Sequence, residues 1–487
     1  MKKVFNNKLT KIVATIGPAT ESEEMLKQII EQGMNVARFN TKHGTPEWHH
    51  ERILRVRKVA QELNQPVGIL LDLQGPEIRI NLPQEKSIEF KEGDKVAFSA
   101  YLDTALPDLD SSISGQTNLA QIPQNVIDLL EPGLLILIDD GLCQFEVTSK
   151  HQNYVEAVAL DQFTLKHRKS MSIPGVVTDM PVLIDNDYVQ LDGIQDDEVD
   201  YVALSFVRNK EDIEILRSEL EKRSLTAGIV SKIENQAALD NLDEIIDASD
   251  AIMIARGDLG VEVPFEELIF WQRKMIEKCR QAAKPVITAT HMLETMIDKP
   301  LPTRAEISDV AHAIYDQTDA IMLSGETTIG QFPVRAVQTQ ARIAAFNEKQ
   351  IEPDPISVPE TDRINIADAV NCLALRPLNS IQPNIDKIIC LTETGRTASL
   401  ISRNRLKIPV HVITSTKRCY HKLTLHFGLI PHLVDWPKDE YLVNAQQVID
   451  KLGPVDWLQP GEKVLVLHGP QWGKSGHTNT ISYLEIV

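Results

Sequence analysis

Two carboxylates stand close behind short apolar runs: Glu234 follows the run 228–233, and Asp258 follows the run 251–255. No His or Cys accompanies them, and carboxylates without such ligands suit Mg²⁺ or Mn²⁺ completed by water and substrate oxygens. The alternative is that the two side chains cap helices or pair with Arg256 and Lys232.

Positive charge and backbone N–H groups occur beside these carboxylates. Arg38 and Lys232 lie near the ends of apolar runs and offer fixed charge to a phosphate or carboxylate. Gly257 and Asp258 stand where a helix could begin, which would present N–H groups to an anion. Phosphoryl transfer requires such a cationic, metal-lined site, because its catalysis is mainly positioning and charge neutralisation.

The apolar runs predict how these residues come together. Eight runs begin near residues 11, 34, 67, 201, 228, 251, 285 and 320, and most are separated by room for one amphipathic helix. About eight such units predict an α/β fold with a closed parallel (β/α)₈ TIM barrel, whose active site lies at the C-terminal strand ends. At those ends stand Arg38, Asn40, Asp72, Lys232, Glu234, Gly257, Asp258 and Thr290.

The spacing of the runs also predicts the other domains. Residues 76–175 alternate apolar and polar positions between Gly, Pro and Asp turns, so we expect a small β-barrel lid inserted between barrel segments 1–75 and 176–350. Residues 351–363 are rich in proline and acid and predict a linker. Strand and helix patterns follow, so we expect an open α/β regulatory domain over 351–487.

Charge and composition exclude several classes of protein. Fifty Lys and Arg against 69 Asp and Glu leave a net charge of −19, which argues against nucleic acid or an anionic membrane as partner. No apolar run approaches the roughly 18 residues of a membrane span, and the start lacks the apolar core of a secretory signal. Five scattered cysteines without a CxxC pair predict neither disulfides nor structural zinc. We expect a cytoplasmic protein.

Many segments together resemble one enzyme family. They are 11–20, 34–44, 70–79, 229–235, 252–264, 284–297, 302–314, 319–327 and the closing 476–487. Their content and order resemble pyruvate kinase of the bacterial three-domain type, without an extra C-terminal extension. The resemblance implies transfer of the phosphoryl group of phosphoenolpyruvate to ADP, which gives ATP and, after protonation of the enolate, pyruvate in the last step of glycolysis.

The resemblance also implies roles for the residues at the strand ends. Glu234 and Asp258 would hold Mg²⁺, Lys232 would neutralise charge on the transferring phosphoryl group, and Arg38 would clamp the phosphate. The N–H groups of Gly257 and Asp258 would hold the substrate carboxylate. Thr290 would belong to the proton relay.

The nucleotide side is implied in the same way. Arg79 and Lys169 match positions that contact the phosphates of ADP, with a second divalent ion arriving on the nucleotide. Pro18 and His43 are expected to line this side of the site.

The site for a monovalent cation departs from the family pattern. Asn40 and Asp72 match two usual K⁺ ligands, but Lys42 and Leu73 stand where Ser and Thr are usual. An ammonium has about the size of K⁺, so we expect Lys42, held by Asn40 and Asp72, to replace the ion; the alternative is that Lys42 faces solvent. Gln74 and His291 also depart from the pattern, as the usual residues are Lys and Gln.

The family binds a sugar-phosphate effector at a loop of its C-terminal domain. The matching loop here has Thr392, Thr394, Gly395, Arg396 and Thr397, and hydroxyls with a glycine at a helix start can cradle a phosphate. Glu393 would repel a bisphosphate, so we expect a sugar-monophosphate or nucleotide effector, or none. An ordinary capped turn is the alternative. A homotetramer is implied by resemblance only.

Two other functions remain open from the sequence. A different barrel enzyme that enolises pyruvate or phosphoenolpyruvate would share the metal and anion site but would not need the lid, Arg79 or Lys169. A catalytically silent relative would serve as a metabolite sensor.

Overall fold

The predicted eight-stranded barrel is present. The computed structural model describes residues 8–102, 118–351, 385–438, 440–474, 476 and 478–487; the predicted linker, apart from Ile351, lies outside them. The strands close in the order β1-β17-β16-β15-β14-β13-β3-β2, all parallel, and each starts within two residues of its predicted start. They are β1 (Lys11–Thr15), β2 (Val36–Asn40), β3 (Gly68–Asp72), β13 (Tyr201–Leu204), β14 (Gly228–Ile233), β15 (Ala251–Ala255), β16 (Val286–Ala289) and β17 (Ala320–Leu323).

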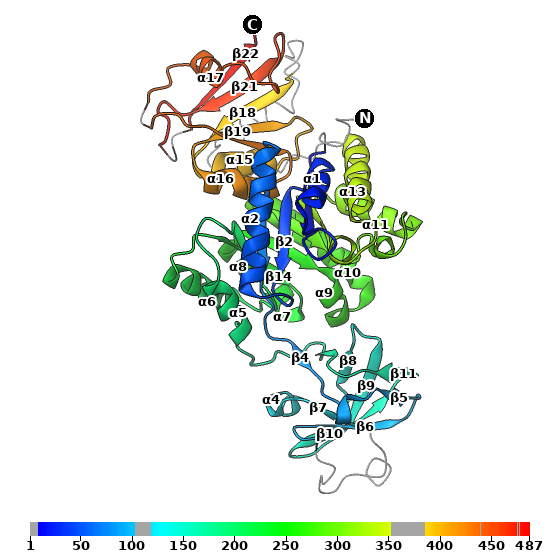
Figure 1. Ribbon diagram of the computed structural model, residues 1–487. Helices are drawn as coiled ribbons and strands as arrows, with labels where there is room; N and C mark the ends of the chain where they lie inside the picture. Colours follow the sequence, from blue (N-terminus) through cyan, green and yellow to red (C-terminus); the bar gives the residue numbers. More distant parts are fainter. Residues whose placement is uncertain (1–7, 103–117, 352–384, 439, 475, 477) are drawn as a thin grey trace.

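Amphipathic helices surround the barrel (Figure 1). In α1 the apolar face of Leu26, Ile29 and Ile30 is buried, and Ser22 caps the first turn by accepting the N–H of Met25. Similar side-chain caps begin α2, α6 and α11, so these helix starts follow from the sequence locally. The principal barrel helices are α1 (Glu23–Glu31), α2 (Pro46–Glu62), α6 (Lys210–Lys222), α10 (Leu268–Ala282), α11 (Arg304–Tyr315) and α13 (Pro333–Asn347).

The region inserted after β3 forms its own sheet and core, as predicted. Seven strands pair in the order β4-β12-β8-β9-β10-β6-β7, and an isolated bridge between Asn81 and Gln121 links the two edges into a small barrel. Phe90, Phe98 and Phe145 fill its separate core. The strands are β4 (Ile78–Arg79), β6 (Lys95–Ser99), β7 (Leu119–Gln121), β8 (Leu135–Ile138), β9 (Cys143–Lys150), β10 (Tyr154–Ala159) and β12 (Ser170–Ser172), with β5 (Ile88–Phe90) and β11 (Phe163–Leu165) paired beside them.

The C-terminal part is an open α/β sheet, also as predicted. Its five strands run in the order β20-β19-β18-β21-β22, with only β22 antiparallel to its neighbour. Figure 1 shows this sheet and the inserted sheet at opposite ends of the barrel. The elements are β18 (Lys387–Leu391), α15 (Arg396–Ser402), β19 (Val410–Thr414), α16 (Lys417–Lys422), η5 (Leu423–Leu425), β20 (Leu429–Leu433), α17 (Ala445–Leu452), β21 (Lys463–His468) and β22 (Thr480–Glu485).

The C-terminal part closes the base of the barrel, where the strands begin. Leu425 is fully buried in the same apolar cluster as the inward-facing barrel residues Val13, Leu70 and Met253. A Cβ on Gly68, at the start of β3, would lie 2.5 Å from Thr424 Oγ1, so this close approach requires glycine.

Ionic contacts hold the same junction. Arg405 and Asp319 form an ion pair at 2.6 Å with both side chains 3% exposed, and Lys11 donates to the carbonyl of Leu429 at 2.6 Å. Buried charges persist only when paired and hydrogen-bonded, so the two parts are fixed to each other by more than apolar contact.

The structure also describes four of the cysteines and the length of the helices. Cys143, Cys279, Cys390 and Cys419 are buried free thiols, which agrees with the prediction of no disulfides for the part of the chain that is described. Among the helices of the described residues, none combines the length and apolar character needed to cross a bilayer.

Candidate active site

Arg38 and Asp72 form the innermost contact of the barrel mouth. Arg38 Nε and Nη2 each lie 2.7 Å from Asp72 Oδ2, and Nη1 donates to Thr15 Oγ1 at 2.8 Å. Burial would raise the pKa of Asp72, which is 1% exposed, but the charges of Lys232 and Arg38 outweigh burial and lower it. Asp72 is therefore an ionised counter-charge to two cations.

Lys232 lies across the mouth from Arg38 and contacts three acceptors. Its Nζ donates to Ser205 Oγ at 2.8 Å and lies 2.9 Å from Glu234 Oε1 and 3.5 Å from Asp72 Oδ1. Burial would lower the pKa of Lys232, but the charges of Asp72 and Glu234 reverse this and raise it. The lysine therefore stays charged, which a role in neutralising a phosphoryl group requires.

Glu234 and Asp258 are the predicted metal ligands, and the donor set fits a hard divalent cation. Glu234 Oε2 accepts the N–H of Phe206 at 2.6 Å, whereas the buried Oε1 has only the ammonium of Lys232 as partner among the described residues. Burial raises the pKa of Glu234; Lys232 opposes this effect and the charge of Asp258 adds to it. Asp258 is exposed to the cleft. The described residues contain no cluster of three or more His, Cys, Asp or Glu, so the further ligands of such a cation would come from water or substrate.

Arg256 fixes the loop that carries the predicted Thr290. Its guanidinium contacts both carboxylate oxygens of Asp309 at 2.6 and 2.7 Å and donates to the carbonyls of Ala289 and Thr290. The alternative in which Arg256 pairs with Asp258 is therefore wrong, while the pairing of Lys232 with Glu234 is confirmed. Asp258 is left free of Arg256 and available for a metal.

Thr290 has a strained backbone at the position predicted for proton transfer. Its φ is 66°, and that of His291 is 54°, although a β-branched residue rarely adopts the left-handed region. Thr290 Oγ1 accepts the N–H of Gly257 at 2.7 Å and donates to the carbonyl of Ala289 at 2.7 Å. The structure thus brings Thr290 and Gly257 into contact, with the Gly257 N–H already bonded.

Lys42 does not make the contacts predicted for it. Its Nζ lies 3.2 Å from Glu77 Oε1 and 3.1 Å from Oε2, on the turn that leaves β3, and not at Asp72. Asn40 Oδ1 instead accepts the backbone N–H of Lys42, and Leu73 is buried. Lys42 thus shares Glu77 with Arg79, whereas Asp72 already has Arg38 and Lys232 as partners.

The predicted nucleotide residues divide into two groups. Arg79 and Lys169 lie together because β4 pairs with β12, but Arg79 bonds Glu77 at 2.8 Å and Lys169 bonds Asp139 at 2.6 Å. Pro18 and His43 are exposed on barrel loops. The two cations are therefore neighbours at the edge of the lid, each paired with an acid in the absence of nucleotide.

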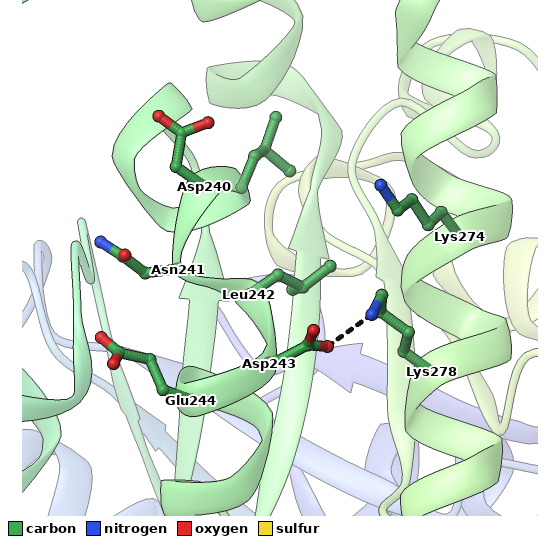
Figure 2. Close-up of a pocket in the computed structure, with 8 residues that line it drawn as sticks. Asp240, Asn241, Leu242, Asp243, Glu244, Lys274 and Lys278 are labelled. Carbon is green, nitrogen blue, oxygen red and sulfur yellow. Dashed lines mark hydrogen bonds and ion pairs between the residues drawn. The ribbon is translucent and has the colours of Figure 1, made fainter.

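A cleft separates the barrel from the inserted sheet. It encloses about 200 Å³ and has Glu234 and Asp258 on the barrel side and Asp140 and Ser170 on the lid side. Burial raises the pKa of Asp140, and the nearby charge of Asp258 raises it further. A second hollow of about 360 Å³ lies outside the barrel, between α7–α8 (236–248) and α10, where Lys278 pairs with Asp243 (Figure 2); it includes no residue of the predicted active site.

The predicted effector loop is a turn held by its own hydrogen bonds. Thr392 Oγ1 accepts the N–H of Gly395, and Glu393 accepts the hydroxyl of Ser415 at 2.6 Å. Thr394 and Arg396 are exposed, and Thr397 lies 3.4 Å from Thr478. Glu393 therefore uses one neighbouring hydroxyl that an anion could otherwise bind.

Sequence reasoning missed three residues of the site. Thr15 positions Arg38, Ser205 positions Lys232, and Asp309 binds Arg256. Thr15 and Ser205 lie at the ends of the first and fourth barrel strands. Considering hydroxyl residues at the strand ends, and not only charged residues, would have identified both Thr15 and Ser205.

Comparisons with known proteins agree with this geometry. The family model for the pyruvate kinase barrel domain matches residues 7–337, and that for the pyruvate kinase alpha/beta domain matches 368–482. A pyruvate kinase of Sporosarcina psychrophila is 41% identical over 96% of this chain and 79% of its own length, and one of Geobacillus stearothermophilus is 39% identical over the same shares. A crystal structure of a pyruvate kinase from Cryptosporidium parvum has a TM-score of 0.86 at 31% identity, covering 99% of this chain and 97% of that one.

Substituting Asp72→Asn should destabilise the protein by about 3–5 kcal/mol at pH 7, because two buried cations lose their counter-charge. Since the pKa of Asp72 is lowered in the folded state, its stabilisation is present above the unfolded pKa of about 3.9 and is lost as the pH falls through the folded value. The difference between parent and variant, measured by urea unfolding, should therefore shrink below about pH 4. Asp192→Asn, at an exposed pair with Arg223, is the control; an equal loss there would contradict the prediction.

Proposed function

The chain belongs to the pyruvate kinase family, and from this premise we propose that it transfers the phosphoryl group of phosphoenolpyruvate to ADP, giving pyruvate and ATP in the last step of glycolysis. The observation that carries the proposal is the buried cluster of Arg38, Lys232, Asp72 and Glu234 at the C-terminal ends of the barrel strands. Family membership makes the chain a phosphotransferase and disfavours both the enolising barrel enzyme and the silent sensor.

Each residue then has a defined task. Arg38, fixed by Asp72 and Thr15, binds the phosphate, and Lys232 neutralises charge that develops on the transferring group. Glu234 and Asp258 would hold Mg²⁺ or Mn²⁺, which when bound supplies positive charge to the enolpyruvate oxygens. The N–H groups of Gly257 and Asp258 would hold the substrate carboxylate, that of Gly257 in exchange for Thr290 Oγ1, and Thr290 passes a proton from water towards the methylene carbon.

The nucleotide is expected at the edge of the lid. Arg79 and Lys169 would exchange Glu77 and Asp139 for the phosphates of ADP, which arrive with a second divalent ion. Pro18 and His43, exposed on barrel loops, would line the base or ribose side. A cytoplasmic location, expected from the composition, and a homotetramer, implied by the family, remain predictions.

The activity is tested by ADP-dependent formation of pyruvate from phosphoenolpyruvate in a coupled assay with saturating Mg²⁺. Lys232→Met should lower turnover by orders of magnitude while binding of phosphoenolpyruvate changes far less, because the charge matters most in the transition state. The control is Lys278→Met, in the hollow outside the barrel, which should leave turnover near normal. Near-normal turnover of Lys232→Met would remove this lysine from the mechanism.

We propose further that the enzyme works without K⁺. Lys42 replaces a hydroxyl ligand and Leu73 lacks the side-chain oxygen of another, while Asp72 is already in contact with two cations. Lys42 itself pairs with Glu77 and not with Asp72, so the proposal rests on the two missing ligand oxygens and not on repulsion by its ammonium.

Activity in tetramethylammonium buffer free of K⁺ and NH₄⁺ should therefore be close to that with K⁺ added. Lys42→Ser with Leu73→Thr should create a K⁺ requirement, because both ligand oxygens return. Strong activation of the parent by K⁺ would contradict the proposal.

The C-terminal loop is proposed to bind a sugar monophosphate or a nucleotide, or no effector. Glu393 lies in the loop, accepts the hydroxyl of Ser415 and would repel a second phosphate. Calorimetry should therefore detect no tight binding of fructose 1,6-bisphosphate. Tight binding that is lost in Thr394→Ala would show the opposite.

A further inference from the structure

Lys232 covers the carboxylate that the proposed divalent cation would need. Its Nζ lies 2.9 Å from Glu234 Oε1, and this oxygen has no other partner among the described residues. The other oxygen, Oε2, is held by the N–H of Phe206 at 2.6 Å. Glu234 is 1% exposed and cannot turn away to offer a different oxygen without leaving that N–H.

We propose that Lys232 is an internal counter-ion which masks Glu234 in the substrate-free enzyme, and that metal binding displaces it towards the phosphoryl group. The inference rests on the proposed function, since it assigns Glu234 to the metal and Lys232 to the phosphate. It adds that the metal site and the phosphate site both depend on breaking the Lys232–Glu234 ion pair: the metal needs Glu234, and the phosphoryl group needs Lys232.

The contacts of Lys232 make this exchange physically reasonable. Two positive groups cannot share Glu234 Oε1 at contact distance without strong repulsion in a buried site. In its observed position the ammonium also has Ser205 Oγ at 2.8 Å and Asp72 Oδ1 at 3.5 Å as partners, and these remain available when it leaves Glu234. Ser205 is itself anchored, because it donates to the carbonyl of Leu73 at 2.8 Å. One N–H of Lys232 is thereby released while the other contacts hold the side chain in the mouth.

The exchange implies reciprocal coupling. A metal on Glu234 frees Lys232 for an anion, and an anion that draws Lys232 away uncovers Glu234 for the metal, by the same factor in both directions. Arg38 takes no part in this competition, because its contacts are with Asp72 and Thr15 and not with Glu234. It is therefore a matched comparison: a second cation of the same cluster that does not touch the metal ligand.

The test measures Mn²⁺ binding to the substrate-free protein by electron paramagnetic resonance of the free ion, at one pH and ionic strength. Lys232→Met should bind Mn²⁺ at least about tenfold more tightly than the parent, within the usual range of coupling between sites. Arg38→Met removes the same charge from the same cluster. The increase in Mn²⁺ affinity caused by Lys232→Met should be at least about three times the increase caused by Arg38→Met. A smaller difference between the two variants, or no tightening in Lys232→Met, overturns the proposal.

A measurement on the parent decides the matter if Lys232→Met does not fold. Amidination of lysines, followed by mass spectrometry, should label Lys232 faster when Mg²⁺ is added, because the ammonium leaves Glu234, whereas Lys42, paired with Glu77, should keep its rate. An unchanged rate for Lys232 overturns the proposal. Neither measurement requires turnover, so an inactive parent in the coupled assay would reject the proposed function, while an active parent without these effects would reject only the masking.

Discussion

Asp72 lies between two cations of the active site, Arg38 and Lys232. Its carboxylate offsets the repulsion between them, so both can contact the same bound anion. Because Asp72 is 1% exposed, water cannot take over this task. The position follows from the barrel itself, since the parallel strands β2, β3 and β14 bring residues from their C-terminal halves to one end of the barrel. The arrangement of the charged groups in the active site therefore depends on this carboxylate.

Around that cluster, buried acids hold the loops that carry the chemistry. Asp187 accepts the N–H groups of Gln74 and Gly75 at the exit of β3 towards the lid. Glu326 accepts those of Leu293 and Ser324, which fixes the loop after β16 against β17. Each carboxylate replaces backbone partners that an irregular loop lacks. The rigidity of the site therefore comes as much from these caps as from the strands.

The sequence predicted the barrel well because burial on both faces leaves near-continuous apolar runs, as in 251–255 and 320–323. It predicted which residues meet at the rim, since strand ends fix backbone positions. It did not predict where long side chains point: Lys42 reaches Glu77 rather than Asp72, and Arg256 reaches Asp309 rather than Asp258. Those choices depend on where each acid lies relative to the long side chain, which is a property of the packed structure and not of spacing along the chain.

The burial of Leu425 in the barrel interior bears on how the protein is made. The last barrel strand ends at Leu323, so about one hundred further residues must be synthesised before the base of the barrel can close. Until then a nascent chain on the ribosome exposes an apolar opening among the strand beginnings. The barrel and the C-terminal sheet therefore share one apolar core, and the segment that completes this core is translated only after every barrel strand.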